Sequence, residues 1–268
     1  MRRSIAMNRF VLTWVMCCFP LTALSAVVGE EVVYQQGDTQ MKGYLAYDDA
    51  IQEKRPGILV VHEWWGHNAY ARSRSKQLAA MGYTALAVDM YGDGKQADHP
   101  KDAGRFAGEV KKNMQTASAR FQAAMDLLQA HQTVAASDIS AIGYCFGGGM
   151  VLEMARRGLD LDLVSSFHGS LPTSTPAAKG AVKAEVLVFN GADDPFVKPE
   201  HIEAFKAEMD QAGVKYSFTN YPGAKHSFTN PEADKFGNKF DLPLQYDPSA
   251  DKQSWQALTQ ALDGIYGK

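Results

Sequence analysis

The chain has 268 residues, of which 46% are hydrophobic and 21% are charged, and its formal net charge at pH 7 is -3. This length and composition suit one large domain with a substantial core and require no second domain. The sequence has no basic run and no patch of interleaved arginine and aromatic residues, which argues against nucleic acid or another polyanion as the partner. A small-molecule substrate fits the composition better.

Residues 1–26 have the pattern of a secretory signal peptide, with three arginines before an uncharged apolar run that ends in small residues. A membrane anchor is the alternative, but Pro20 interrupts the run, and its roughly 17 residues are at the short limit for spanning a bilayer. We therefore expect an exported protein, periplasmic or secreted, without a membrane span. Because three arginines and no acidic residue leave with the leader, the mature domain at 27–268 would carry a formal charge of -6.

Cleavage of the leader would also leave a single cysteine. Cys17 and Cys18 lie within the predicted leader, so Cys145 would be the only thiol of the mature chain and could form no internal disulfide. An unpaired thiol is uncommon in an exported protein, because oxidising compartments favour disulfides. The alternative to a functional thiol is a buried, inert cysteine that acts as a small hydrophobic residue.

Short β-branched runs alternate with longer helical patterns along the chain, which is typical of a mostly parallel sheet flanked by helices. An antiparallel edge is expected near Val32 and over residues 41–46. The expected strands that follow are residues 57–62, 84–89, 139–143, 163–168, 185–190 and 215–221. Apolar residues spaced by threes and fours predict helices at residues 69–81, 101–131, 148–157, 199–212 and 249–265. The predicted fold class is a single-domain α/β protein that binds its ligand at the carboxyl ends of the strands.

A glycine-rich turn follows the strand expected at residues 139–143. Its sequence GYCFG, residues 143–147, matches the G-x-S-x-G turn of hydrolases with Cys145 in the position of the serine. Glycines are needed there because a strand that turns directly into a helix leaves no room for flanking side chains. The helix N-terminus favours a thiolate, and the Phe146 N–H would face a developing oxyanion. The alternative is a purely structural or phosphate-binding turn.

Two further chemical groups follow later strands. Asp193 and Asp194 come directly after the strand expected at residues 185–190, and His226 lies on a loop after the last strand. Each has an ordinary explanation by itself, as a turn cap or as a loop histidine. The order nucleophile, acid, base is nevertheless that of α/β-hydrolases. We therefore expect Cys145 to attack, His226 to transfer the proton and Asp194 to orient the imidazole.

From Gly43 to its end the sequence resembles the dienelactone hydrolase family. The segments that carry the resemblance are VHEWWGHN at residues 61–68, GYCFGG at 143–148, GADDPFV at 191–197 and GAKHSF at 223–228. The resemblance implies an α/β-hydrolase fold and a triad formed by Cys145, Asp194 and His226. Because the second aspartate of the pair is the triad member in that family, Asp193 is the second choice for the acid. It also implies hydrolysis of a lactone or carboxylic ester, as by a carboxymethylenebutenolidase, without a metal or an organic cofactor.

The resemblance extends to the loop after the third strand. It implies that Glu63 interacts with the nucleophilic cysteine and influences whether the sulfur is a thiol or a thiolate, since a nearby carboxylate opposes ionisation. Without the resemblance Glu63 would be an exposed loop acid. By the same correspondence the Trp64 N–H is the second oxyanion donor, together with that of Phe146. His62 and His67 are five positions apart, which does not fit the H-E-x-x-H spacing of a zinc site.

One departure from the family affects the expected substrate. The family has an arginine four residues after the triad histidine that binds the substrate carboxylate, and this chain has Asn230 there. A second family arginine has only Arg105 as a counterpart. Loss of a bidentate carboxylate partner argues against assuming a dienelactone as the substrate. His168 either borders the site or is a structural histidine.

The expected function is hydrolysis of a lactone or activated ester through a thioester acyl-enzyme on Cys145. One alternative is a broader carboxylesterase or thioesterase without a preference for lactones. The alternative from another class is a non-catalytic thiol protein that senses oxidation or binds a ligand on the same fold.

Overall fold

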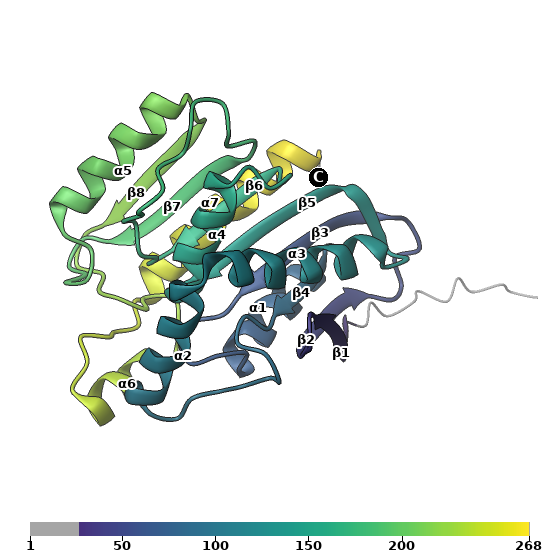
Figure 1. Ribbon diagram of the computed structural model, residues 1–268, viewed down its shortest axis with the longest axis horizontal. Helices are drawn as coiled ribbons and strands as arrows, with labels where there is room; N and C mark the ends of the chain where they lie inside the picture. The colour runs from purple at the N-terminus through teal and green to yellow at the C-terminus, as the bar shows by residue number, and fades with distance from the viewer. Residues whose placement is uncertain (1–26, 268) are drawn as a thin grey trace, which may run out of the picture.

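The computed structural model describes residues 27–267 (Figure 1), so the signal peptide predicted at residues 1–26 lies outside the described residues. The elements follow in the order β1 (Val27–Gln36), β2 (Thr39–Asp48), β3 (Arg55–Val61), α1 (Ala69–Ala80), β4 (Thr84–Val88), α2 (Pro100–Lys112), α3 (Met114–Ala130), β5 (Val134–Tyr144), α4 (Phe146–Arg156), β6 (Leu163–Phe167), β7 (Glu185–Gly191), α5 (Pro199–Ala212), β8 (Tyr216–Tyr221), α6 (Ala233–Phe240) and α7 (Pro248–Tyr266).

The described strands form one sheet in the order β1-β2-β4-β3-β5-β6-β7-β8. The pairs β1 with β2 and β2 with β4 are antiparallel, and every other neighbouring pair is parallel. The prediction of a mostly parallel sheet with an antiparallel edge is thereby confirmed. The carboxyl ends of β3, β5, β6, β7 and β8 consequently meet along one edge, which is where ligands bind in such sheets.

Both faces of the sheet are buried under helices, as Figure 1 shows. The alternation along β3 illustrates this, because successive side chains of a strand point to opposite faces. Leu59 and Val61 join the apolar cluster that contains residues of α3 and α4. Ile58 and Val60 join the cluster formed with α1 and α7. A strand with apolar side chains on both sides is expected in a parallel sheet that has helices packed on both faces.

The single helix predicted at residues 101–131 is wrong, because the structure has two helices, α2 and α3, separated at Asn113. The backbone of Asn113 has φ -128° and ψ 76°, outside the helical region, and its side chain accepts the Thr116 N–H at 3.0 Å. Asparagine at this position caps α3 and ends α2. The apolar spacing continues on both sides of the break, so periodicity alone did not show it.

Helix α6 was not predicted, and it packs at the carboxyl edge of the sheet. The Trp65 ring stacks on Phe236 of α6 with centroids 4.4 Å apart, and it is 2% exposed. Trp65 is therefore a core residue that seats α6, whereas its neighbour Trp64 faces the pocket described below. The segment after α6 is fastened beside the last strand by the Gln245 N–H, which donates to the carbonyl of His226 at 3.1 Å.

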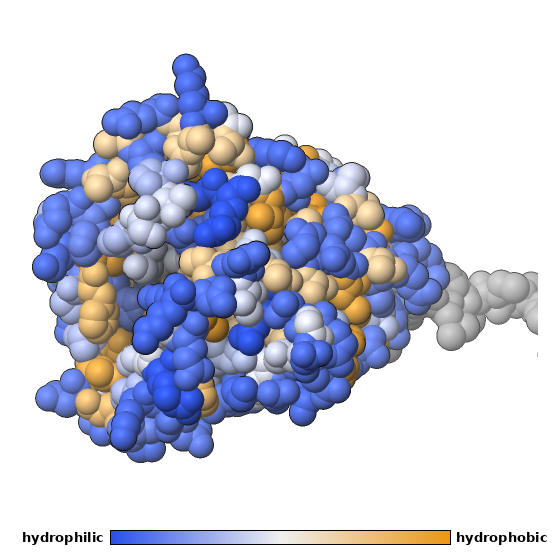
Figure 2. Space-filling view, in the orientation of Figure 1, coloured by the Kyte–Doolittle hydropathy of each residue, from blue (hydrophilic) through white to orange (hydrophobic). Residues whose placement is uncertain are grey.

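The face of the molecule seen in Figure 2 is mostly hydrophilic, and apolar residues reach it in small separate areas. Among residues 27–267 no helix combines the length and apolar character needed to cross a bilayer.

Candidate active site

Cys145 is the single residue between the end of β5 and the start of α4. Its backbone has φ 53° and ψ -112°, a sparsely populated conformation for a side-chain-bearing residue. The close fit around the turn explains its glycines. A Cβ on Gly147 would lie 2.3 Å from the carbonyl oxygen of Val61, and one on Gly143 would lie 2.2 Å from that of Gly147. Only glycine lets β3, β5 and α4 approach closely enough to present the thiol.

His168 lies behind the cysteine rather than in the pocket. The Cys145 N–H donates to the Phe167 carbonyl at 3.0 Å and to Nδ1 of His168 at 3.1 Å. The His168 side chain is fully buried, and this burial lowers its pKa well below the ordinary value. The neutral ring therefore accepts at Nδ1 and donates from Nε2 to the Thr229 hydroxyl, 2.7 Å away.

The structure joins three of the predicted residues in one line of contacts. Nε2 of His226 lies 3.0 Å from Sγ of Cys145, and Nδ1 of His226 lies 2.7 Å from Oδ2 of Asp194. The other carboxylate oxygen of Asp194 accepts the Phe196 N–H at 2.8 Å, which fixes the orientation of the carboxylate. Asp193, the second choice for the acid, is exposed and makes no such contact.

The protonation state of His226 follows from its surroundings. Burial alone lowers the pKa of His226, but the negative charge of Cys145 and the hydrogen bond with Asp194 outweigh burial and raise the pKa to about 10. An imidazolium held next to a thiolate is the arrangement that activates a cysteine for attack.

Glu63 lies at the site but faces the loop that follows His226. It is 1% exposed; the Ser227 hydroxyl donates to Oε1 at 2.8 Å and the Asn230 amide donates to Oε2 at 2.6 Å. Burial raises the pKa of Glu63, and the two hydrogen bonds oppose that rise. Within the described residues no hydrogen bond joins Glu63 to Cys145. Ser227 was not predicted to belong to the site.

Two residues that share the pocket with Cys145 have backbone N–H groups without an acceptor in the described part of the chain. The Trp64 N–H donates no hydrogen bond within the described part of the chain. Phe146 is the first residue of α4, so its N–H has no acceptor one helical turn earlier. Both residues line the same pocket as Cys145. Unoccupied N–H groups at this place are what the oxyanion of an acyl-transfer intermediate requires.

The pocket in front of the thiol has a volume of about 330 Å³. It is lined mostly by apolar side chains, and its lining residues are Trp64, Ala107, Lys111, Cys145, Phe146, Gly169, Ser170, Phe196, Val197, His226, Leu242 and Leu244. Arg105 lies outside it, exposed on α2, where it pairs with Asp102 and Glu109. The cation that α2 contributes to the lining is instead Lys111, which was not predicted from the sequence.

His62, next to Glu63, is held within the fold by both ring nitrogens. Nδ1 of His62 lies 2.6 Å from the Glu63 carbonyl, and its Nε2 accepts the Met90 N–H at 3.3 Å. Both ring nitrogens of His62 are thus used within the protein. In the part of the chain that the structure describes, no group of three or more histidine, cysteine, aspartate or glutamate side chains is placed to hold a metal ion.

A mostly parallel eight-stranded sheet, a strained residue between β5 and α4, and a histidine after the last strand define an α/β-hydrolase. The chain belongs to the dienelactone hydrolase family, whose model matches residues 41–265. It is a hydrolase of the esterase type.

Relatives and solved structures agree with this assignment. A protein of Aquifex aeolicus that carries the name carboxymethylenebutenolidase is 25% identical, over 85% of this chain and 95% of that protein. The Protein usf of Aquifex pyrophilus is 27% identical over the same shares of the two chains. The crystal structure of a dienelactone hydrolase-like promiscuous phosphotriesterase from metagenomic libraries is similar, with a TM-score of 0.85 and 35% identity, covering 90% of this chain and 99% of that one.

Proposed function

We propose that this hydrolase cleaves a lactone or carboxylic ester through Cys145, His226 and Asp194, by way of a thioester acyl-enzyme. The observation that carries the proposal is the unbroken line of contacts from Sγ to Nε2 at 3.0 Å and from Nδ1 to Oδ2 at 2.7 Å. That line opens on a pocket large enough for a small ester. The arrangement has a nucleophile, a base and a group that orients the base, which acyl transfer requires.

In the first half of the reaction, Sγ of Cys145 attacks the carbonyl carbon. The negative charge that develops on the carbonyl oxygen is stabilised by the N–H groups of Trp64 and Phe146. The bond to the alcohol oxygen then breaks, and the imidazolium of His226 gives its Nε2 proton to the departing alkoxide. A thioester on Cys145 and a neutral His226 remain.

In the second half, His226 accepts a proton from water, and the resulting hydroxide attacks the thioester carbonyl. The carbon–sulfur bond breaks, so that the carboxylic acid leaves and the thiolate of Cys145 is restored beside a protonated His226. Asp194 accepts the Nδ1 hydrogen bond throughout and stabilises the positive charge of the ring.

The pocket is lined mostly by apolar side chains, with Lys111 as the cation of its lining, and it lacks the family's arginines, which favours an ester without a carboxylate. Asn230 occupies the position of the family's arginine, and its amide donates to Glu63. Arg105 is not part of the pocket lining and pairs with Asp102 and Glu109. Phe196 is 54% exposed and meets the His226 ring edge-on with centroids 5.0 Å apart. An exposed phenylalanine contributes little to the core, so we assign it to contact with an apolar part of the substrate.

Replacement of the nucleophile tests the proposal. We expect Cys145→Ala to abolish turnover of aryl esters and lactones while the circular dichroism spectrum and the melting temperature stay those of a folded protein. In the wild type, brief exposure to an activated ester should add one acyl group to Cys145 in intact and peptide mass spectra. Ser170→Ala, which removes an exposed hydroxyl from the pocket lining, is the control and should remain active. Undiminished turnover by Cys145→Ala would refute the assignment.

A broader carboxylesterase or thioesterase is the second candidate, and Asn230 together with the apolar lining favours it. Comparison of kcat/KM for a lactone, an aryl ester and a thioester of related acyl groups separates the two candidates. An aryl dialkyl phosphate belongs in the same panel because of the phosphotriesterase relative. A non-catalytic thiol protein would show no acyl adduct and no product burst on any of these compounds.

We also propose that the protein is exported, on the basis of the arginines, the apolar run and the small residues within residues 1–26. N-terminal sequencing of protein recovered from the periplasm or the medium tests this. The expected mature chain begins close to residue 27, and an intact Met1 on that material would contradict export by cleavage.

A further inference from the structure

Both carboxylate oxygens of Glu63 are taken up by residues one and four positions after His226. Ser227 donates to one oxygen and Asn230 to the other. The orientation of the Asn230 amide is fixed, because its Oδ1 accepts the Glu232 N–H at 2.9 Å. The amide must therefore present its N–H group to Glu63. Two donors aimed at the two oxygens favour the ionised carboxylate at this position.

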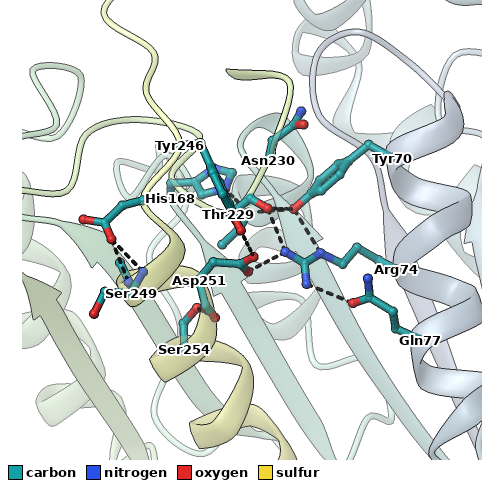
Figure 3. A network of polar contacts seen from close by, with 12 residues as sticks. Tyr70, Arg74, Gln77, His168, Thr229, Asn230, Tyr246, Ser249, Asp251 and Ser254 are labelled. Carbon is teal, nitrogen blue, oxygen red and sulfur yellow. Dashed lines mark hydrogen bonds and ion pairs between the residues drawn. The ribbon is translucent and has the colours of Figure 1, made fainter. Parts of the chain in front are cut away.

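The segment that carries these two donors is held in place by the network of hydrogen bonds and ion pairs shown in Figure 3. Thr229, between the two donors, is fully buried. Its hydroxyl lies 2.7 Å from Nε2 of His168 and 2.6 Å from the Tyr70 hydroxyl, and its carbonyl accepts from Arg74 at 2.7 Å. Both the hydroxyl and the carbonyl of Thr229 are thus held by hydrogen bonds to other segments of the fold.

The network continues into two helices that lie far apart in the sequence. Arg74 on α1 also donates to Asp251 on α7 at 2.5 Å and to Gln77 at 3.0 Å (Figure 3). Ser227 itself has φ 60°, a left-handed conformation that residues other than glycine adopt only where their surroundings impose it. The loop from His226 to Asn230 is therefore fixed rather than free to follow Glu63.

The position of Glu63 matters because of what a free carboxylate would do to the thiol. A carboxylate beside Cys145 would favour the neutral thiol, both by repelling a thiolate and by accepting a hydrogen bond from S–H. In the described structure the sulfur has its hydrogen bond with His226 instead.

The other titratable groups that face Glu63, Cys145 or His226 are Tyr70, Arg74, Tyr91, Tyr144, His168 and Asp194. Burial raises the pKa of the three tyrosines and lowers the pKa of His168, so these four are neutral near pH 7. Arg74 and Asp194 are the charged members of this group. Neither of them competes with His226 for the thiol proton, because Arg74 is cationic and Asp194 is bound to the far nitrogen of the ring.

We propose that Ser227 and Asn230 are positioning residues that clamp Glu63 against their own loop and so prevent it from competing with His226 for Cys145. The inference rests on the proposed function, in which Cys145 is the nucleophile. The clamp keeps the thiolate paired with the imidazolium in the resting enzyme. A substrate then needs no charged group of its own to displace Glu63 and release the nucleophile, in keeping with the apolar pocket.

Alkylation of Cys145 tests the clamp without requiring turnover. The rate of modification by iodoacetamide is measured by mass spectrometry between pH 5 and pH 9 for the wild type, Asn230→Ala and Ser227→Ala. We expect the wild-type rate to change little across neutral pH. In each variant the rise of the rate with pH should lie about one pH unit higher, so that below both midpoints the variant reacts about tenfold more slowly than the wild type. Asn238→Ala, an exposed asparagine on α6, is the matched control and should behave as the wild type.

A double variant separates the clamp from a general loosening of the loop. If released Glu63 suppresses the thiolate, Glu63→Gln combined with Asn230→Ala restores the wild-type alkylation rate, because the competing charge is gone. Unchanged profiles in both single variants, or a double variant that stays slow, would overturn the clamp. If the wild type forms no acyl adduct with an ester while the alkylation shifts and the rescue appear as expected, the proposed hydrolysis fails and the clamp stands.

Discussion

At the scale of single residues, His226 is held between two negative groups that act in the same direction. Cys145 and Asp194 together raise the pKa of its ring to about 10 despite its burial. Because the pKa is raised, the protonated ring persists through neutral pH and is lost only as the pH rises through that value. The proton that the leaving group needs is therefore available under ordinary conditions.

Asp194→Asn should move the alkaline limb of the pH profile. The amide removes the charge next to Nδ1, so the imidazolium is less stable and loses its proton at lower pH. We expect the decline of kcat/KM at high pH to begin at least about one pH unit lower than in the wild type. Ester hydrolysis measured from pH 6 to pH 11 gives the profile. Asp193→Asn, at the exposed neighbouring position, is the control, and an equal displacement in both variants would argue against a specific role of Asp194.

The site residues that lie just after the carboxyl ends of strands could be predicted from the sequence. Cys145, Asp194 and His226 come shortly after β5, β7 and β8, and parallel strands bring such positions together at one edge. The partners of Glu63 were not predictable in the same way. Ser227 lies 164 positions away from it, and neither residue's local pattern indicates the other. The direction of Glu63 is decided by the fold of the loop and not by its own sequence neighbours.

At the scale of elements, the turn between β5 and α4 depends on close approach of backbones. The matched pair Gly147→Ala and Gly108→Ala tests this. A Cβ on Gly147 meets backbone atoms of Val61 at 2.3 Å, whereas a Cβ on Gly108 within α2 meets nothing within 4 Å. We expect Gly147→Ala to lower the free energy of unfolding by about 3 kcal/mol. Gly108→Ala should raise it by about 0.5–1 kcal/mol through helix propensity.

Urea denaturation of both variants measures these changes. A Gly147→Ala protein as stable and as active as the wild type would show that the turn can widen without cost. The contrast between the two glycines matters because both occur in apolar-patterned segments of the sequence, and only one of them is packed against backbone.

Most elements were predictable from the spacing of apolar residues, with ends that differ by one or a few positions. The strand predicted at residues 139–143 is longer in the structure, where β5 spans Val134–Tyr144. Two features were not predicted from the sequence, for different reasons. The break at Asn113 is a capping interaction of one side chain, which interrupts no apolar pattern. Helix α6 is short and is held by the aromatic contacts of Trp65, which are distant in sequence.

At the scale of the whole molecule, the ion pair between Arg74 and Asp251 joins residues 177 positions apart. It links α1, early in the chain, to α7 at its end, and both helices cover the same face of the sheet. The side chains are only 6% and 17% exposed, so removal of one partner leaves a buried charge without its counter-ion.

Asp251→Ala should accordingly destabilise the fold. We expect the free energy of unfolding to fall by about 3–5 kcal/mol, the usual effect of breaking a buried pair from one side. Urea denaturation measures the change. The exposed pair of Lys235 and Glu232 on and beside α6 provides the comparison, and Lys235→Ala should alter stability by less than about 1 kcal/mol. Similar small effects for both variants would mean that water reaches Arg74.

The fold class and the family followed from the alternation of strands and helices together with four short segments, and the matching family model confirms them. The packing of helices on both faces could be expected from the strands that are apolar on both sides. The network around Thr229 could not, because each of its hydrogen bonds joins segments that only the completed fold brings together.

The break at Asn113 also bears on how this protein can acquire new preferences in evolution. It makes α2, which contributes Ala107 and Lys111 to the pocket wall, a separate helix from α3, whose residues fill the core. A displacement of α2 caused by a substitution in the pocket wall is therefore not carried along a continuous helix into α3. Among the described residues, no hydrogen bond joins Ala107 or Lys111 to the loop from His226 to Asn230. We therefore expect substitutions of Lys111, which is exposed on the pocket wall, to change substrate preference more than they disturb the reacting groups, whereas Ala107 also packs in the core.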